Sequence, residues 1–187
     1  MRDLSLHLMD IVQNSGKGIA SAIDILIEVV PEIDQLILFV GDNGSGMPAE
    51  LVERVKDPFV TSRTTRSVGL GIPLLKELCE LTGGHLELES ELSVGTKLTA
   101  HLGLSSIDRL PLGSVGDTMM ILISADPQLD YCLTFRAPER EFELRLSDVR
   151  EEVPDLPLDD PSVLLWLREY IAEQQLAVFT GYLDEIA

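Results

Sequence analysis

Three polar residues spaced along one predicted helix could hold a hydrated cation. Asp10, Asn14 and Lys17 are four and then three residues apart, so on a helix they share one face. A carboxylate, an amide oxygen and an ammonium in a row suit a divalent cation and the phosphates that it bridges. A solvated helix face would show the same pattern, because surface helices carry polar faces by default. Both interpretations stay open at this point.

A second candidate is the glycine-dense segment DNGSGM at residues 42–47, which follows the apolar run 36–40 after Gly41. Loops at strand ends often hold ligands, and Gly44 and Gly46 would let the backbone approach a flat ligand closely. The Asp42 carboxylate could accept a hydrogen bond from an exocyclic amine. The alternative is a tight turn with an Asx cap, which needs the same residue types.

A third candidate is the segment SVGLGIP at residues 67–73. Gly69 and Gly71 would expose backbone amides at the start of a helix, where the helix dipole favours an anion. A plain helix start would look similar. Residues 54–66 carry four cations and one carboxylate, which predicts a basic lid over a polyphosphate or a basic surface loop.

Hydrophobic periodicity places these segments on regular elements. The pattern predicts helices over residues 4–20, 48–55 and 70–82 and strands over residues 22–30, 36–40, 85–89 and 97–102. The order is helix, hairpin, helix, helix, hairpin. It predicts an α/β (α+β) fold, a two-layer sandwich in which helices cover one face of a mixed β-sheet.

The sequence predicts two parts, a first domain at residues 1–103 and a small, acidic α+β accessory segment at residues 104–187. The apolar stretches 118–124 and 129–135 could form a hairpin, or the first of them could begin a helix. A third strand is expected over residues 141–146. Asp160 followed by Pro161 predicts the start of a helix, and Trp166 within it is expected in the core. We expect this segment to dock on the first domain or to present a partner surface.

In this order the motifs resemble the GHKL superfamily of ATP-binding domains, which includes gyrase, heat-shock chaperones, histidine kinases and MutL. The resemblance covers roughly residues 4–103. DIVQNSGK is similar to the N-box and DNGSGM to the G1 box. DPFVTSR is similar to the F-box of histidine kinases and SVGLGIPLL to the G2 box, and SVGT resembles the closing Gly-Thr. The family's Bergerat fold agrees with the predicted sandwich.

The resemblance implies ATP and Mg²⁺ as ligands and assigns roles to single residues. Asn14 would coordinate Mg²⁺, Lys17 would contact phosphate, and Asp42, supported by Thr96, would bind the adenine amino group. Asp10 stands where relatives carry Glu or Asn and would be the candidate catalytic base. The remaining implied ATP-binding residues are Gly44 and Gly46 in the adenine loop, Phe59, Thr61 and Arg63 in the lid, and Gly69, Leu70 and Gly71 at the phosphates.

Other features narrow the function. Ser67 and Val68 depart from the family's G2 pattern. His7 has no adjacent acidic partner, and His85 and His101 form no metal-ligand spacing with a third group. The segment after residue 103 contains no lysine, which disfavours the mechanism of gyrase and MutL.

Composition excludes several partners. The chain has 14 Lys and Arg against 32 Asp and Glu, which disfavours nucleic acid and anionic membranes. The two cysteines form no CxxC motif. The sequence also shows no apolar run long enough to cross a membrane and no signal-peptide pattern. These features predict a cytoplasmic protein.

Together these features predict an ATP-binding protein of the histidine-kinase-like branch. It would hydrolyse ATP or pass the γ-phosphate to a phosphoacceptor protein in trans. The alternative is a nucleotide-gated interaction module with little catalysis, and homodimer formation is left open.

Overall fold

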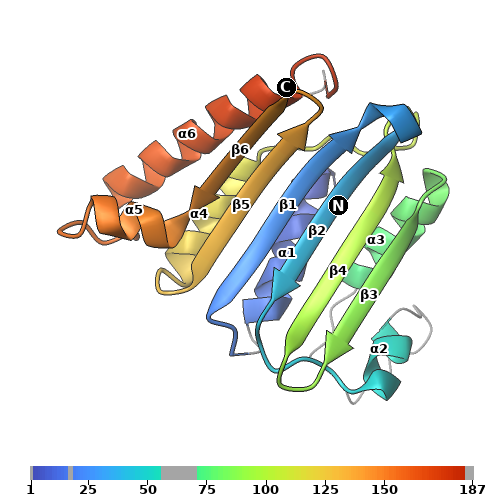
Figure 1. The fold of residues 1–187 in the computed structure, drawn as a ribbon, viewed down its shortest axis with the longest axis horizontal. Helices are drawn as coiled ribbons and strands as arrows, with labels where there is room; N and C mark the ends of the chain where they lie inside the picture. Colours follow the sequence, from blue (N-terminus) through green and yellow to red (C-terminus); the bar gives the residue numbers. More distant parts are fainter. Residues whose placement is uncertain (1, 17–18, 56–70, 184–187) are drawn as a thin grey trace.

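Six strands form one mixed sheet in the computed structural model, which describes residues 2–16, 19–55 and 71–183. The order across the sheet is β3-β4-β2-β1-β5-β6 (Figure 1). β1 pairs in parallel with β5, and all other neighbours pair antiparallel. The strands are β1 (Ala22–Val30), β2 (Gln35–Asp42), β3 (His85–Glu91), β4 (Gly95–Gly103), β5 (Asp130–Ala137) and β6 (Arg140–Arg145).

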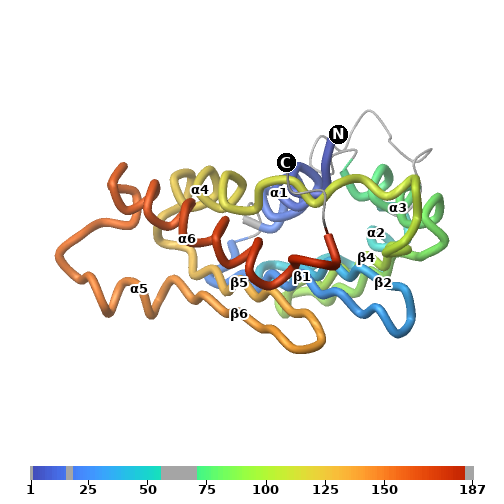
Figure 2. The backbone as a smooth tube through the Cα atoms, turned by 90° about the horizontal axis from the view of Figure 1, so that it is seen from above, coloured from blue at the N-terminus to red at the C-terminus, as the bar shows by residue number. Residues whose placement is uncertain are grey.

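Helices cover one face of this sheet, as Figure 2 shows for α1, α3 and α4. The alternation on β1 explains the asymmetry, because Ile23, Ile25 and Ile27 are buried while Asp24 is exposed on the other face. This is the predicted two-layer α/β fold. The helices are α1 (Leu4–Gly16), α2 (Ala49–Val55), α3 (Gly71–Leu81), α4 (Val115–Ala125), α5 (Leu146–Glu152) and α6 (Pro161–Phe179), with a short 3₁₀ turn at Pro31–Ile33.

The segment after residue 103 continues the same sheet. β5 lies beside β1, with Ile25 opposite Leu133. The buried Gln175 of α6 ties the start of α4 in place, because its Oε1 accepts from Val115 N (3.0 Å) and its Nε2 donates to Gly113 O (2.8 Å). The sheet therefore crosses the predicted boundary at residues 103 and 104. Separate domains on either side of it stay a prediction.

The structure confirms some of the elements predicted for residues 104–187 and contradicts others. Residues 118–124 lie in α4, so the helical alternative is confirmed and the hairpin with residues 129–135 is wrong. Ser114 caps that helix by accepting from Asp117 N, and β5 forms its hairpin with β6 instead. The predicted cap at Asp160 is confirmed, because its side chain accepts from Ser162 N. Trp166 is 52% exposed, so its expected place in the core is wrong.

The first predicted helix ends earlier than expected. α1 stops at Gly16, and Ile19 has a left-handed backbone with a φ of 63°. Among the residues described, no helix combines the length and the apolar character needed to cross a membrane.

Candidate functional site

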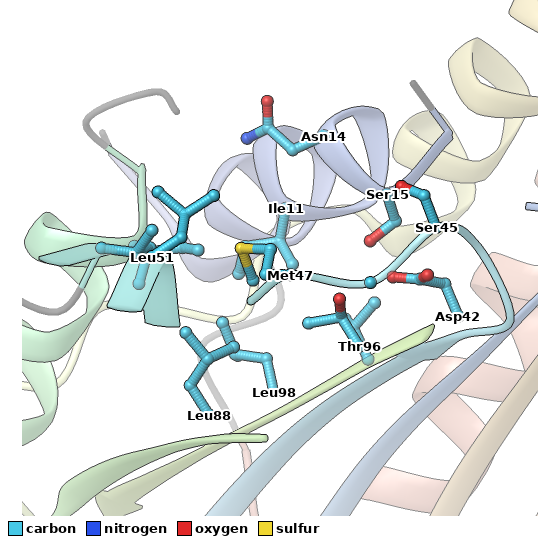
Figure 3. A pocket seen from close by; sticks show the side chains of 14 residues that line it. Ile11, Asn14, Ser15, Asp42, Ser45, Met47, Leu51, Leu88, Thr96 and Leu98 are labelled. Atoms are coloured by element: carbon cyan, nitrogen blue, oxygen red, sulfur yellow. The ribbon is translucent and has the colours of Figure 1, made fainter. Parts of the chain in front are cut away.

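A cavity of about 240 Å³ opens between α1, α2 and the ends of β2, β3 and β4 (Figure 3). Its walls are mostly apolar, with a few polar groups converging on it, which is typical of a small-molecule site. The lining residues are Ile11, Asn14, Ser15, Val40, Asp42, Ser45, Gly46, Met47, Leu51, Val55, Ile72, Leu88, Thr96 and Leu98.

Asp42 is the charged residue among the described ones that line this cavity. It ends β2, a central strand, and in Figure 3 its carboxylate points into the cavity. Gly44 N donates to Asp42 Oδ1 at 2.9 Å, so the following turn fixes the carboxylate and leaves Oδ2 for a ligand. The predicted tight turn and the predicted ligand contact are therefore compatible, because each uses a different oxygen.

Thr96 lies opposite Asp42 in the β2–β4 register and is held by Ser90. The Ser90 hydroxyl accepts from Met47 N (2.8 Å) and donates to Gly95 O (3.0 Å). Its single hydrogen is then used, so the Thr96 hydroxyl donates to Ser90 Oγ across 2.9 Å. The lone pairs of Thr96 Oγ1 remain as acceptors. The polar floor thus offers acceptors to a ligand that donates.

Two glycines bring the backbone segments of the site together. Gly46 has a φ of 61°, and a Cβ there would lie 1.9 Å from Glu91 O. Gly95 has a φ of 132°, and a Cβ there would lie 1.9 Å from Asp42 O. Only glycine fits at such positions. The DNGSGM loop and the start of β4 therefore pack backbone to backbone beneath the cavity.

α1 contributes the other side of the site. Asn14 lies on α1 at the rim of the cavity (Figure 3). Asp10, one turn earlier, lies against the first residue of α3, because a Cβ on Gly71 would be 1.8 Å from Asp10 Oδ2. This oxygen is buried and has no hydrogen-bond partner among the described residues. A buried oxygen of this kind calls for a donor or a cation.

The donor set fits a magnesium nucleotide. Mg²⁺ is usually held by one or two protein oxygens together with substrate phosphates, and Asn14 at the rim of the cavity supplies one such oxygen. An apolar cavity with acceptors on its floor fits a flat base that carries an amino group. The structure thus brings Asn14, Asp42, Gly46 and Thr96 around one cavity, with Gly44 buried in the loop.

The other predicted site residues divide into two groups. Asp10 and Gly71 contact each other, and Asp10 is not among the lining residues. Six residues lie outside the described part of the chain, and their roles stay predictions: Lys17, Phe59, Thr61, Arg63, Gly69 and Leu70.

Sequence reasoning missed most of the cavity wall and one supporting residue. Leu88 and Leu98 face the cavity from β3 and β4, and the alternation of those strands was the available signal. Met47 directly follows the glycine loop. Ser90 gave no local signal, because its role depends on the pairing of β3 with β4.

The histidines lie away from the cavity lining. Burial lowers the pKa of His7, which is 3% exposed. Burial also lowers the pKa of His101, and the neighbouring His85 lowers it further. The prediction that His85 and His101 lack a third ligand is wrong, because ligand atoms of His85, Glu87 and His101 lie within 4.8 Å of one another. Strand pairing brings these residues together, and their spacing along the chain hides it.

The geometry and the motifs agree with a family comparison. Residues 2–106 match the model of the histidine kinase-, DNA gyrase B-, and HSP90-like ATPases. The chain therefore belongs to this family and carries its ATP-binding domain.

Individual relatives are similar over part of their length. The chain is 34% identical over 68 residues to sensor kinase CckA of Brucella abortus, covering 36% of this chain and 7% of that protein. It is 29% identical over 111 residues to sporulation kinase D of Bacillus subtilis, covering 54% and 20%. It is 32% identical over 107 residues to sensor protein DivL of Caulobacter vibrioides, covering 49% and 14%. The matches thus span a fifth or less of these relatives.

The Aquifex aeolicus MutL ATPase domain complexed with ADP superposes with a TM-score of 0.47 at 16% identity. The superposition covers 82% of this chain and 68% of that one.

Proposed function

We propose that this chain binds Mg²⁺-ATP in the cavity and transfers the γ-phosphate to an acceptor on a separate protein, with water as a slower acceptor. The observation that carries the proposal is the cavity itself. Its floor presents oxygens from Asp42 and Thr96, its walls are apolar, and Asn14 stands at its rim.

The floor supports adenine binding. The Asp42 oxygen that is not used by Gly44 accepts from the 6-amino group, and the Thr96 hydroxyl adds a second acceptor. Leu88, Leu98 and Met47 would enclose the faces of the ring. A base with a carbonyl in place of the amino group would place two acceptors against each other, so this floor favours adenine over guanine.

The α1 side supports phosphate chemistry. Mg²⁺, when bound, would neutralise phosphate charge, and Asn14 would hold it. The N-terminus of α3 begins at Gly71, directly beside Asp10. We assign Asp10 as the base that takes the proton from the attacking hydroxyl or water through a bridging water. The oxygen of that group would bond to the γ-phosphorus while the bond from the γ-phosphorus to the leaving ADP oxygen breaks.

Transfer to another protein is supported by the placement of the histidines. All three histidines of the chain are described, and none of them lines the cavity. His7 is buried in α1, and His85 and His101 lie on the sheet face opposite the helices. The proposed acceptor is therefore none of these three histidines.

One observation favours the second candidate, a nucleotide-gated interaction module. Asp10 packs against Gly71 and is not among the cavity-lining residues. Without a base in reach, ATP would change the affinity for a partner and little turnover would follow.

Mg²⁺ dependence, a cytoplasmic location and a homodimer also stay predictions.

Incubation with γ-labelled ATP in a native lysate tests the proposal. A labelled second protein supports transfer, released phosphate supports hydrolysis, and ATP binding with neither product supports the gated module. Asn14→Ala should abolish the Mg²⁺-dependent product. Gln13→Ala, at the exposed neighbouring position on α1, is the matched control and should behave like wild type. Equal product with wild type and Asn14→Ala contradicts a metal role for Asn14.

A further inference from the structure

Three potential metal ligands gather on the sheet face opposite the one that borders the ATP cavity. His85 begins the edge strand β3, and its register partner is His101 on β4. Glu87 follows two residues along β3, so it shares a face with His85. The cavity uses Leu88 and Leu98, which point to the helix-covered face. The cluster is therefore separate from the nucleotide site.

The distances approach those of a metal centre. His85 Nε2 lies 3.1 Å from Glu87 Oε1, and the ligand atoms of all three residues lie within 4.8 Å of one another. Ligand atoms around a tetrahedral zinc ion are roughly 3.3 Å apart when the bonds are about 2.0–2.1 Å. The His85–Glu87 pair is already at that spacing. Small side-chain rotations would bring in the third ligand.

Gln35 orients His101 for coordination. Gln35 Oε1, at the start of β2, lies 3.1 Å from His101 Nδ1. A carbonyl oxygen can only accept, so Nδ1 carries the hydrogen and the Nε2 lone pair is left bare. Histidines that bind metals almost always donate their second ring N–H to an oxygen in this way. His101 thus has the outer partner typical of a metal ligand.

We propose that His85, Glu87 and His101 bind a divalent transition-metal ion, with Zn²⁺ the best match to two imidazoles and one carboxylate. The two imidazole rings are stacked at 4.4 Å with their planes 5° apart. One ring must tilt to share an ion with the other, and the exposed His85 has room to do so. Water completes the coordination. The bound ion would pin the edge strand β3 to β4.

Zinc titration of the full chain by calorimetry, after removal of trace metal with a chelator, tests the site near neutral pH. Wild type should take up one Zn²⁺ per chain without nucleotide present. His85→Asn, Glu87→Gln and His101→Asn should each weaken binding by at least about tenfold, because even outer partners change metal affinity by about 10–100-fold. Glu89→Gln is the matched control, since Glu89 is an exposed carboxylate on the same strand, and it should bind like wild type.

Gln35 separates orientation from direct coordination. Gln35→Leu should weaken zinc binding about tenfold, whereas Gln35→Glu, which keeps an acceptor, should bind zinc like wild type. Circular dichroism confirms that each variant is folded.

Proton NMR of wild type gives a readout that needs no variant. The chain has three histidines, so their ring signals can be assigned. Zn²⁺ should shift the signals of His85 and His101 and leave those of His7 unchanged. Absence of saturable uptake, wild-type affinity in folded His101→Asn, or a shift confined to His7 would overturn the site.

Discussion

Asp42→Asn is the sharpest test of the nucleotide site, because the structure dictates how the new side chain must sit. Gly44 N donates to Asp42 Oδ1 at 2.9 Å, and this bond keeps the turn in place. The asparagine therefore keeps its oxygen toward Gly44 and turns its NH₂ group into the cavity. A donor then faces the adenine amino group where an acceptor stood.

The cost follows from one lost hydrogen bond to a charged group, about 1.5–3 kcal/mol. That corresponds to ATP binding weaker by roughly 10- to 150-fold, since about 1.4 kcal/mol is a factor of ten. GTP carries a carbonyl at the same place and should gain relative to ATP. The two side chains have nearly the same shape, so the free energy of unfolding should change little.

Calorimetric titration with ATP and with GTP measures both effects. Asp24→Asn makes the same chemical change at an exposed position of β1 on the opposite face, and it should leave both affinities unchanged. If folded Asp42→Asn binds ATP as tightly as wild type, the assignment of the cavity floor is refuted.

Three further predictions concern stability. Gly46→Ala should lower the free energy of unfolding by about 1–3 kcal/mol or more, because its φ is 61° and its Cβ would meet Glu91 O. Gly83→Ala, at a φ of 81° with nothing within 4 Å, should cost less in the same urea titration, and equal costs would contradict the steric argument. Phe135→Ala should lower the free energy of unfolding by about 3–5 kcal/mol, since Phe135 is fully buried, whereas Trp166→Ala should lower it by about 1 kcal/mol or less. Thermal denaturation tests this ranking, and a larger loss for Trp166→Ala would contradict it. Burial raises the pKa of Cys79 from 9.0 to about 12. Above pH 9 the unfolded thiol ionises while the folded one stays protonated, so the free energy of unfolding should fall by up to about 1.4 kcal/mol per pH unit as the pH rises toward 12. Cys79→Ala should show a shallower fall in denaturant titrations over that range, and an identical fall would contradict the attribution.

The layered fold and the nucleotide loop were predictable because their signals are local. The alternation of β1 and the apolar run of β2 define buried strands, and the glycines of residues 42–47 define the loop. The parallel pairing of β5 with β1 had no such signal. It joins residues about a hundred positions apart, and either edge of the first four strands could have received it.

The exposure of Trp166 shows that its position on the helix decides its burial, and not the general tendency of tryptophan to be buried. The buried stripe of α6 includes Leu164, Leu167 and Ile171, spaced three and four residues apart. Trp166 falls outside that stripe and stacks on Tyr170 instead, with ring centroids 5.4 Å apart. Counting the phase from the leucines would have placed it correctly.

The histidine cluster was also within reach of the sequence. A hairpin that turns near Ser93 pairs His85 with His101 and sets Glu87 on the same face. Scanning for ligands along the chain overlooks such a group, because its members are adjacent only after the strands pair. The lid residues differ in kind, since their predicted roles fall on residues 56–70, outside the described ranges.

The parallel pairing of β1 with β5 predicts how truncated forms of this protein behave. A chain cut after residue 103 would retain every ATP-binding motif and yet strip the partner from Ala22–Glu28. The exposed backbone donors and acceptors of β1, next to the apolar side chains that Leu133 and Phe135 had covered, would favour pairing with a second truncated copy. Chains truncated there should therefore oligomerise or precipitate, because residues 104–187 supply the strand that covers the β1 edge.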